Sequence, residues 1–596
     1  MLCKLRLFAF ICVTLFFCYS SDCLAQEEYP ENDSVPGQLP AAVHHKRAMV
    51  AAAHPLAAKI GTDILRAGGN AIDATVAVQM ALTVVEPQSS GIGGGCFIVY
   101  YDSNKKQTFC FDGREETPAA ARREQFLTRD GKVVKDALTG CRAAGVPGTV
   151  AGMYLAHQKF GKLKWKQLLQ PAIELAEGGI GVTPRLRDAI LANRSRFLRI
   201  PSSKKQFLLG DEGHVSEIGT VLRLPDLAKT LQRIADHGPR GFYEGETAAL
   251  IVKATEKCVI APGAISLEDL KNYRAIERDP ISFFYRGYHL FGMPPPSSGT
   301  ITLGIILHCL EAMEPEQRNL NSANGIDAWA RAESIGFADR NAYLGDQDWT
   351  RDYQMKYLLA PSRLGQRRAA FLQLKSRQKA KPGELFNLQP STGASGQTEG
   401  EHTTHFSIVD ADRNIVSCTT TIEHGMGCGV VVEGAGFLLN NELTDFDLDL
   451  AEGANALDPS RRTVGGRPAG KRPRSSMTPL IIFKDNQPVM AVGSPGGSRI
   501  IGIVGHVVLN VLDHGMDMQE AINASRSSCR NTTLQLDGMF RNRAELVKQL
   551  ESRGWEIAPL SLGNTVWGGA QGIRLLSDGT LEGGADPRRE GSVRGY

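Results

Sequence analysis

The character of the chain changes abruptly at residue 403, and this change limits the folds that the chain can adopt. Residues 376–402, SRQKAKPGELFNLQPSTGASGQTEGEH, contain few apolar residues and two prolines, which is typical of an exposed loop. The next residues, THFSIVD, alternate between apolar and polar, and the β-branched run IVSCTTTI follows the turn ADRN. An alternation of period two predicts strands, so we expect a hairpin over 404–422 directly behind the loop.

Other segments on each side of residue 403 show the same division. Helical spacing predicts helices near 51–69 and over 71–85, a glycine-rich turn then leads into a strand, and 165–375 is expected to be mostly helical. Beyond residue 403 we expect hairpins over 480–492 and around Asp578-Gly579, and an apolar helix over 498–515. Sheets with faces that need cover indicate a layered α+β architecture.

Length and charge set broad limits. A chain of 596 residues is long enough for one large domain or for two to three domains. Its 42% hydrophobic and 22% charged residues are ordinary for a globular protein. The net charge of +3 gives no reason to expect a nucleic-acid partner.

The first residues have the features of a secretory signal peptide. Lys4 and Arg6 precede an apolar run over 7–17, and Cys23-Leu24-Ala25 provides a small-residue cleavage site. The run is shorter than the ~20 residues that span a bilayer, although an uncleaved anchor is the alternative. We therefore expect a signal peptide over 1–25, a poorly ordered leader over 26–46, and export to the periplasm or the extracellular medium.

Twelve cysteines are present, and eight of them follow the predicted signal peptide. They form neither a CxxC motif nor a zinc-ligand spacing. An exported protein can form disulfides, but wide spacing in a large chain fits buried, reduced cysteines equally well. The sequence therefore does not determine which cysteines, if any, form disulfides.

A backbone cut between His402 and Thr403 would place two reactive groups on one residue. Thr403 would carry a hydroxyl nucleophile and a free α-amine, whose ordinary pKa of ~7.7–8 suits a general base. The amine can take the hydroxyl proton through a water molecule. The motif is weak alone, because Thr-Thr is common at the start of a strand.

Three further motifs strengthen this interpretation. GSPGGSR at 493–499 places Gly496 and Gly497 ahead of an apolar helix, where two N–H groups can hold an oxyanion. KRPRSSMTP at 471–479 provides neighbouring hydroxyls beside basic residues, and LLNNELTDFD at 438–447 provides a group of acids. Each motif also has a structural explanation, as a glycine turn or a cap.

Together these motifs identify a family. HTTHFSIVD, TTTIEHGMG, LLNNELTDFD, KRPRSSMTP and GSPGGSRII, with SGIGGGCF and FDGREETP upstream, closely resemble γ-glutamyltranspeptidase (glutathione hydrolase), an N-terminal-nucleophile hydrolase family. The resemblance covers about residues 47–590 in family order. It implies a four-layer αββα sandwich, formed by a large subunit over 47–402 with a processing loop over 376–402 and a small subunit over 403–596.

The resemblance also implies roles for individual residues. Thr403 is then the self-cleaving residue and the nucleophile, with Thr421 assisting it and Gly496 and Gly497 forming the oxyanion hole. The resemblance implies that Arg114, Ser475 and Ser476 bind the substrate α-carboxylate. It implies that Glu442 and Asp445 bind the α-ammonium. Glu423, which stands where many members have Asn, would also bind the α-ammonium. Arg474 replaces a commoner Leu.

The expected activity follows from these roles. The enzyme would pass the γ-glutamyl group of glutathione or related compounds to water, an amino acid or a dipeptide, without a cofactor or metal. The alternatives are a glutaryl-type β-lactam acylase, a poly-γ-glutamate transpeptidase and a non-catalytic homologue. GIGGG does not fit a dinucleotide-binding motif, and His402, His405 and His424 lack metal-ligand spacing.

Overall fold

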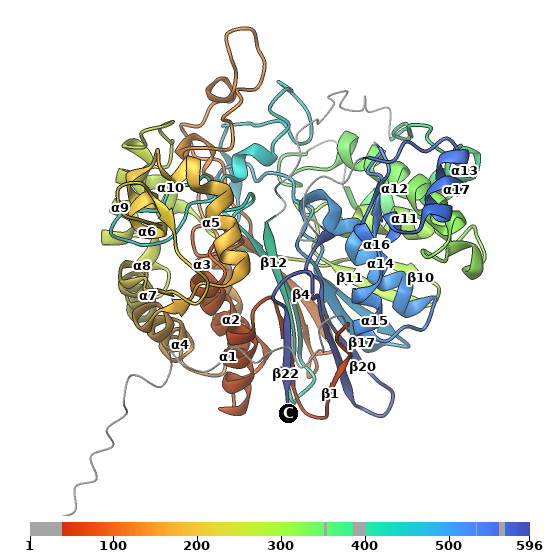
Figure 1. Cartoon of the computed structure of the whole chain (residues 1–596), viewed down its shortest axis with the longest axis horizontal. Coiled ribbons are helices and arrows are strands. Elements are labelled where there is room, and N and C mark those ends of the chain that lie inside the picture. The colour runs from red at the N-terminus through yellow and green to blue at the C-terminus, as the bar shows by residue number, and fades with distance from the viewer. Residues whose placement is uncertain (1–38, 351–354, 386–399, 401, 532, 559–566) are drawn as a thin grey trace, which may run out of the picture.

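The computed structural model describes residues 39–350, 355–385, 400, 402–531, 533–558 and 567–596. Two seven-stranded antiparallel sheets form the centre of the molecule (Figure 1). The first contains, in spatial order, β1 (Val43–His45), β21 (Leu581–Ala585), β20 (Gln571–Leu575), β17 (Gln487–Gly493), β16 (Leu480–Lys484), β11 (Tyr288–Gly292) and β10 (Ile281–Tyr285). The second contains β22 (Ser592–Gly595), β2 (Met49–Ala52), β12 (Thr403–Val409), β13 (Ile415–Thr421), β3 (Gly95–Asp102), β4 (Gln107–Gly113) and β9 (Ile276–Arg278).

The central strand β12 is buried on both faces. Phe406 and Ile408 belong to the apolar core that includes α1 and α2, whereas the alternate residue Val409 belongs to the core that includes the other sheet. Ser407 also faces the other sheet, because its hydroxyl donates to the carbonyl of Gln571 at 3.2 Å. The two sheets therefore stack directly, and their inner faces fix the register of β12.

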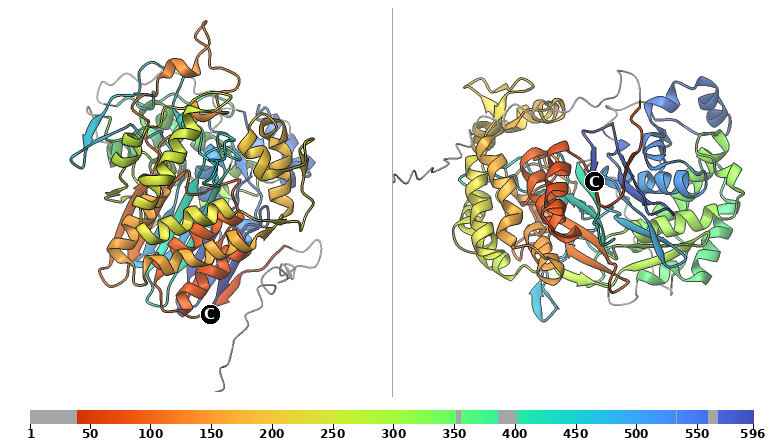
Figure 2. Two further views of the ribbon diagram at one scale, coloured as in Figure 1. Left: turned by 90° about the vertical axis from the view of Figure 1, so that its left-hand side faces the viewer. Right: turned by 90° about the horizontal axis from the view of Figure 1, so that it is seen from below.

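Helices cover the outer face of each sheet (Figures 1 and 2). The second sheet is covered by the helices that belong mainly to the first half of the chain: α1 (Pro55–Arg66), α2 (Ala71–Val85), α3 (Thr149–Phe160), α4 (Trp165–Gly178), α5 (Pro184–Phe197), α6 (Pro201–Phe207), α7 (Pro225–His237), α8 (Arg240–Tyr243), α9 (Gly245–Glu256) and α10 (Leu267–Asn272). The helices on the side of the first sheet are α11 (Gly299–Leu310), α12 (Ala323–Tyr343), α13 (Pro361–Gln373), α14 (Ile500–Leu512), α15 (Met518–Asn523), α16 (Gly538–Arg541) and α17 (Ala544–Ser552). The order of layers is the predicted αββα.

Short elements connect the layers. The 3₁₀ turns are η1 (Arg123–Phe126), η2 (Cys141–Ala143), η3 (Pro315–Arg318), η4 (Met355–Leu359), η5 (Glu442–Asp445) and η6 (Gly497–Arg499). Four two-stranded ribbons are formed by β5 (Ile180–Gly181) with β8 (Val221–Leu222), β6 (Leu208–Leu209) with β7 (His214–Val215), β14 (Arg462–Val464) with β15 (Arg467–Ala469), and β18 (Ser527–Ser528) with β19 (Gln535–Leu536).

The three predicted hairpins and the apolar helix α14 are confirmed. Two expectations are wrong in part. Val43–His45 lies in the segment expected to be poorly ordered, yet it pairs as β1 with β21; residues 1–38 lie outside the described residues. Within 165–375, expected to be mostly helical, residues 276–292 form β9, β10 and β11 instead; β10 and β11 are a hairpin around Arg286-Gly287, and β11 and β9 pair with the distant strands β16 and β4.

None of the helices within the described ranges is long and apolar enough to cross a membrane.

The glycine-rich turn before β3 has a packing role. A side chain on Gly93 would overlap the carbonyl oxygen of Leu438, and one on Gly94 would overlap the carbonyl oxygen of Thr421. The two glycines therefore allow this turn to lie against the end of β13, next to the predicted site.

We expect Gly94→Ala to destabilise the protein by about 1–3 kcal/mol or more, because the added methyl group meets backbone that cannot move freely. Urea unfolding of the purified protein measures the change. Gly178→Ala is the matched control, because an added methyl group there has no neighbour within 4 Å. Equal stability of the Gly94→Ala variant and the control would contradict this explanation of the turn.

Candidate active site

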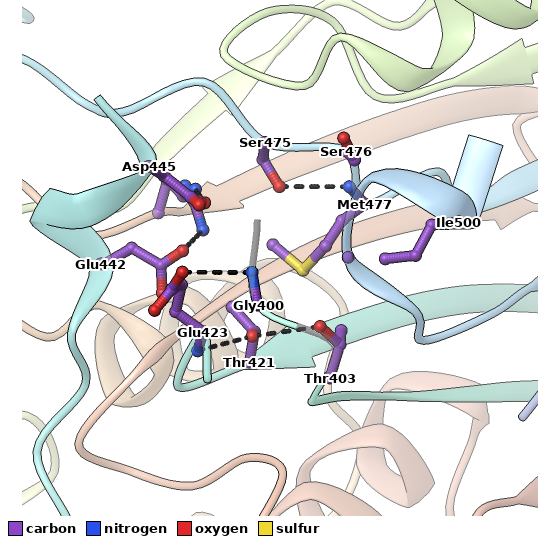
Figure 3. A pocket seen from close by; sticks show the side chains of 12 residues that line it. Gly400, Thr403, Thr421, Glu423, Glu442, Asp445, Ser475, Ser476, Met477 and Ile500 are labelled. Carbon is purple, nitrogen blue, oxygen red and sulfur yellow. Dashed lines mark hydrogen bonds and ion pairs between the residues drawn. The ribbon is translucent and has the colours of Figure 1, made fainter. Parts of the chain in front are cut away.

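The predicted nucleophile and its predicted helper face each other across two strands. Thr403 begins β12 and Thr421 ends β13, and the register pairs them directly. Residues directly opposite in an antiparallel pair bring their side chains close together. Their hydroxyl oxygens are 3.2 Å apart, and both residues are almost fully buried (Figure 3).

The Thr421 hydroxyl also contacts the peptide bond before Thr403. It donates to the carbonyl oxygen of His402 at 3.2 Å and accepts the N–H of Glu423 at 2.8 Å. A hydroxyl has one proton and two lone pairs, so the remaining lone pair can accept the Thr403 hydroxyl proton. Thr421 thus polarises the His402 carbonyl and orients the Thr403 oxygen beside it.

Arg114 and two acids form a buried ion cluster on the opposite side of the pocket. Arg114 is the residue directly after strand β4. Its guanidinium pairs with Glu442 and, at 2.6 Å, with Asp445, and both acids lie on η5. It also donates to the carbonyl oxygens of Pro473 at 3.1 Å and Arg474 at 3.0 Å. The cluster therefore joins three distant parts of the chain.

Burial and charge act in opposite directions in this cluster: burial raises the pKa of Glu442 well above its ordinary value, although Arg114 opposes the change. Burial alone would lower the pKa of Arg114, but the carboxylates of Glu442 and Asp445 hold that pKa above its ordinary value. Burial raises the pKa of the neighbouring Glu115 to about 7, against the opposing effect of Arg114. Glu115 can therefore gain or lose a proton near neutral pH.

The adjacent serines are held in place by different partners. The Ser475 hydroxyl accepts the N–H of Met477 at 3.2 Å, and the Ser476 hydroxyl accepts a hydrogen bond from Arg340 at 2.7 Å. The Ser475 carbonyl accepts the N–H of Ser298 at 2.7 Å, which ties this segment to the start of α11. Both serines line the pocket (Figure 3).

Gly496 and Gly497 lie at the start of η6, ahead of α14. Their φ angles of 137° and 58° lie in the region that favours glycine. Among the residues described, no partner accepts a hydrogen bond from either N–H group. Gly497 lines the pocket, so the pair can supply oxyanion donors.

Glu423 and the end of the processing loop meet in the same pocket. Glu423 accepts the N–H of Gly400 at 3.1 Å and forms an ion pair with His424 at 3.1 Å. Gly400 is buried, so the expected exposed loop over 376–402 is buried at this residue, whereas 386–399 and 401 lie outside the described residues. The loop end reaches the predicted site for the ammonium group.

The pocket brings together nine of the predicted site residues. These are Arg114, Thr403, Thr421, Glu423, Glu442, Asp445, Ser475, Ser476 and Gly497, with Gly400, Met477 and Ile500 as further lining residues. Gly496 is adjacent to Gly497, and the His402 carbonyl is bound by Thr421.

The sequence interpretation missed two residues near the pocket. Arg589 donates to the carbonyl oxygen of Thr403 at 2.9 Å and fixes the start of β12. No motif marks it, because its partner Thr403 lies 186 positions away in the sequence. Glu115 directly follows the predicted substrate-binding residue Arg114 in FDGREETP, and this neighbouring position was the sequence signal that could have identified it. Within the described ranges, no group of three or more His, Cys, Asp or Glu residues could hold a metal ion.

The chain is similar to known proteins in both sequence and structure. A family model described as gamma-glutamyltranspeptidase matches residues 57–596. The glutathione hydrolase proenzyme of Bacillus subtilis (strain 168) is 36% identical over 563 residues, which are 92% of this chain and 92% of that protein. The glutathione hydrolase proenzyme of Escherichia coli (strain K12) is 36% identical over 557 residues, 92% of this chain and 91% of that protein.

Solved structures agree with the fold. Cephalosporin acylase from Bacillus halodurans has a TM-score of 0.80 and 28% identity, and the match covers 95% of this chain and 98% of that one. Helicobacter pylori gamma-glutamyltranspeptidase has a TM-score of 0.53 and 36% identity over 60% of this chain and 98% of that one. The expected N-terminal-nucleophile hydrolase fold is confirmed.

The ion cluster generates a stability prediction. Arg114→Met leaves Glu442 and Asp445 buried without their cation, which should lower the free energy of unfolding by about 3–5 kcal/mol. Combining it with Glu442→Gln and Asp445→Asn should restore part of the loss, because the unpaired charges are then removed. Chemical unfolding measures both variants.

Arg199→Met is the control for this prediction. Arg199 forms an exposed ion pair with Asp136, and its loss should change stability by less than about 1 kcal/mol. An Arg114→Met variant as stable as Arg199→Met would show that the cluster does not depend on its cation.

Proposed function

Because the chain belongs to the γ-glutamyltranspeptidase family, we propose that it is a γ-glutamyltransferase and glutathione hydrolase that uses Thr403 as its nucleophile. The observation that carries the proposal is the single pocket in which the Thr403 hydroxyl faces both the Thr421 hydroxyl and the Arg114–Glu442–Asp445 cluster. This combination offers a nucleophile and a site for a substrate end that bears both charges.

The first proposed step is cleavage of the enzyme's own backbone. The Thr403 hydroxyl attacks the His402 carbonyl, which Thr421 polarises through its 3.2 Å hydrogen bond. The hydroxyl proton passes to the Thr403 nitrogen as the peptide C–N bond breaks, which gives an ester and the free amine of Thr403, and water then hydrolyses the ester. The products are a large subunit that ends at His402 and a small subunit that begins with the free amine of Thr403. The two subunits stay together as a heterodimer because the small-subunit strands β12 and β13 are paired with the large-subunit strands β2 and β3.

Catalysis then uses the same hydroxyl on a substrate. The free α-amine of Thr403 accepts the hydroxyl proton, and the oxygen attacks the γ-glutamyl carbonyl. The N–H groups of Gly496 and Gly497 stabilise the oxyanion, and the leaving amine takes up the proton. Water or an amino-acid acceptor then releases the γ-glutamyl group from the ester.

The ion cluster binds the charged end of the substrate. A γ-glutamyl group carries an α-carboxylate and an α-ammonium on one carbon. The carboxylate binds Arg114 with the hydroxyls of Ser475 and Ser476, while the ammonium binds Glu442, Asp445 and Glu423. Arg114 already pairs with Glu442 and Asp445, so the zwitterion exchanges partners with existing ion pairs.

The proposal includes export. The basic residues and apolar run at the N-terminus support a cleavable signal peptide over 1–25, and the mature protein would act in the periplasm or outside the cell.

The direct test is to incubate the purified protein with glutathione, with and without glycylglycine as acceptor. We expect free glutamate without the acceptor, and a γ-glutamyl dipeptide product in addition when the acceptor is present. Failure to release either product from glutathione would refute the proposed function.

A second measurement separates this function from that of an acylase. A glutaryl donor has the carboxylate but lacks the ammonium, so the acids of the pocket lose their partner. The kcat/KM of wild type for a glutaryl anilide should be lower than for the matched γ-glutamyl anilide by roughly 10³-fold or more. Asp445→Asn should reduce this difference, mainly because it lowers kcat/KM for the γ-glutamyl anilide.

The control for this measurement is Asp449→Asn, which removes an exposed carboxylate outside the pocket and should leave the ratio unchanged. Equal kcat/KM values of wild type for the two anilides would contradict ammonium recognition and favour acylase activity, the activity named for the B. halodurans structure.

A further inference from the structure

Three cysteines that are far apart in the sequence meet beneath a second pocket. Cys141 lies in η2, Cys258 follows α9, and Cys428 lies in the small-subunit segment behind Glu423. The Cys141 thiol donates to the carbonyl oxygen of Ala254 at 3.6 Å, and Cys258 and Cys428 are its cysteine neighbours. All eight cysteines of the described residues are thiols. The cluster lies outside the pocket of Thr403.

The Cys258 sulfur is surrounded by donors. The N–H of Cys141 donates to it at 3.3 Å, and the backbone N–H groups of Ala261 and Ile260 lie near enough to favour its charged form. The Cys141 backbone is held in turn, because the N–H of the next residue, Arg142, donates to the carbonyl of Ala261 at 3.2 Å. Converging N–H groups of this kind stabilise an anion.

These donors change the acidity of the two thiols in opposite directions. The hydrogen bond from Cys141, with those of the backbone N–H groups, lowers the pKa of Cys258 to about 5 although burial opposes the change. Hydrogen bonding to its two cysteine neighbours and burial raise the pKa of Cys141. By contrast, burial raises the pKa of Cys309 to about 12. The lowered pKa favours the thiolate of Cys258, whereas the raised pKa favours the protonated thiol of Cys141 beside it.

Cys258 also has access to a cavity. It lines a pocket of about 150 Å³, next to Leu250, Lys253, Lys257 and Val430. Cys258 is 8% exposed, whereas Cys141 is fully buried behind it. A small molecule that enters this pocket meets Cys258 first. In Figure 1 this region lies at α6 and α9, on the outer side of the helical layer.

We propose that Cys258 and Cys141 form a thiol–disulfide exchange site for low-molecular-weight disulfides, in which Cys258 attacks the disulfide from the pocket and Cys141 resolves the product. The Cys258 thiolate attacks one sulfur of R–S–S–R, which forms a mixed disulfide and releases RS⁻. The Cys141 thiol gives its proton to RS⁻, and its sulfur attacks the Cys258 sulfur. The second RS⁻ leaves, so the small disulfide is reduced by two electrons and a Cys141–Cys258 disulfide forms.

The test uses bis(2-hydroxyethyl) disulfide, which carries no γ-glutamyl group, so the result does not depend on the proposed function. The full-length protein is treated, blocked with an alkylating reagent, digested without reduction and analysed by mass spectrometry. Wild type should give a Cys141–Cys258 crosslinked peptide. Cys141→Ala should instead accumulate the hydroxyethyl adduct on Cys258, and Cys258→Ala should give neither product. Cys309→Ala is the matched control and should behave as wild type.

A second measurement needs no variant. Brief alkylation of wild type with iodoacetamide at about pH 6.5 should label Cys258 at least about 10-fold faster than Cys309, because the thiolate is the reacting form. Equal labelling rates would overturn the proposal. A crosslink from Cys141 to Cys428 in place of Cys258, or no adduct on Cys258 in Cys141→Ala, would overturn it as well.

Discussion

The structure depends on the antiparallel register that places Thr403 opposite Thr421 at the open end of a buried hairpin. Both faces of β12 are covered, so a shift by one residue would exchange its apolar and polar faces and is strongly unfavourable. Arg589 adds a hydrogen bond to the Thr403 carbonyl. The position of the nucleophile is therefore set by packing of the whole sandwich, and no flexible loop has to place it.

In the charged pocket, too, the side chains are held in place by contacts with distant parts of the chain. Arg114 is buried, and it is stable there because two carboxylates and two carbonyl oxygens accept its hydrogen bonds. A substrate end with one carboxylate and one ammonium can exchange partners with this cluster while the total charge of the pocket stays the same. This property favours a zwitterionic γ-glutamyl group over an acyl group with a carboxylate alone.

Much of the fold and the candidate site could be predicted from sequence, where the signal is local. The hairpin at Thr403, the glycines before α14 and the acids of η5 are all short motifs with a clear chemical meaning. The strands β10 and β11 were not predicted, although they form a local hairpin around Arg286-Gly287; only the pairing of β11 with β16 is distant in the sequence. Distance in the sequence explains why Arg589 and the pairing of Arg114 with Glu442 were not predicted, since neither contact has a local pattern.

The most direct test of the central role of Thr403 is the mass of the purified protein and of its fragments. Wild type should separate under denaturing conditions into a large fragment that ends at His402 and a small fragment that begins at Thr403, whereas Thr403→Ala should remain one chain. Thr404→Ser retains a hydroxyl at the neighbouring position and should still be cut. An intact chain in catalytically active wild type, or normal cleavage in Thr403→Ala, would contradict the account.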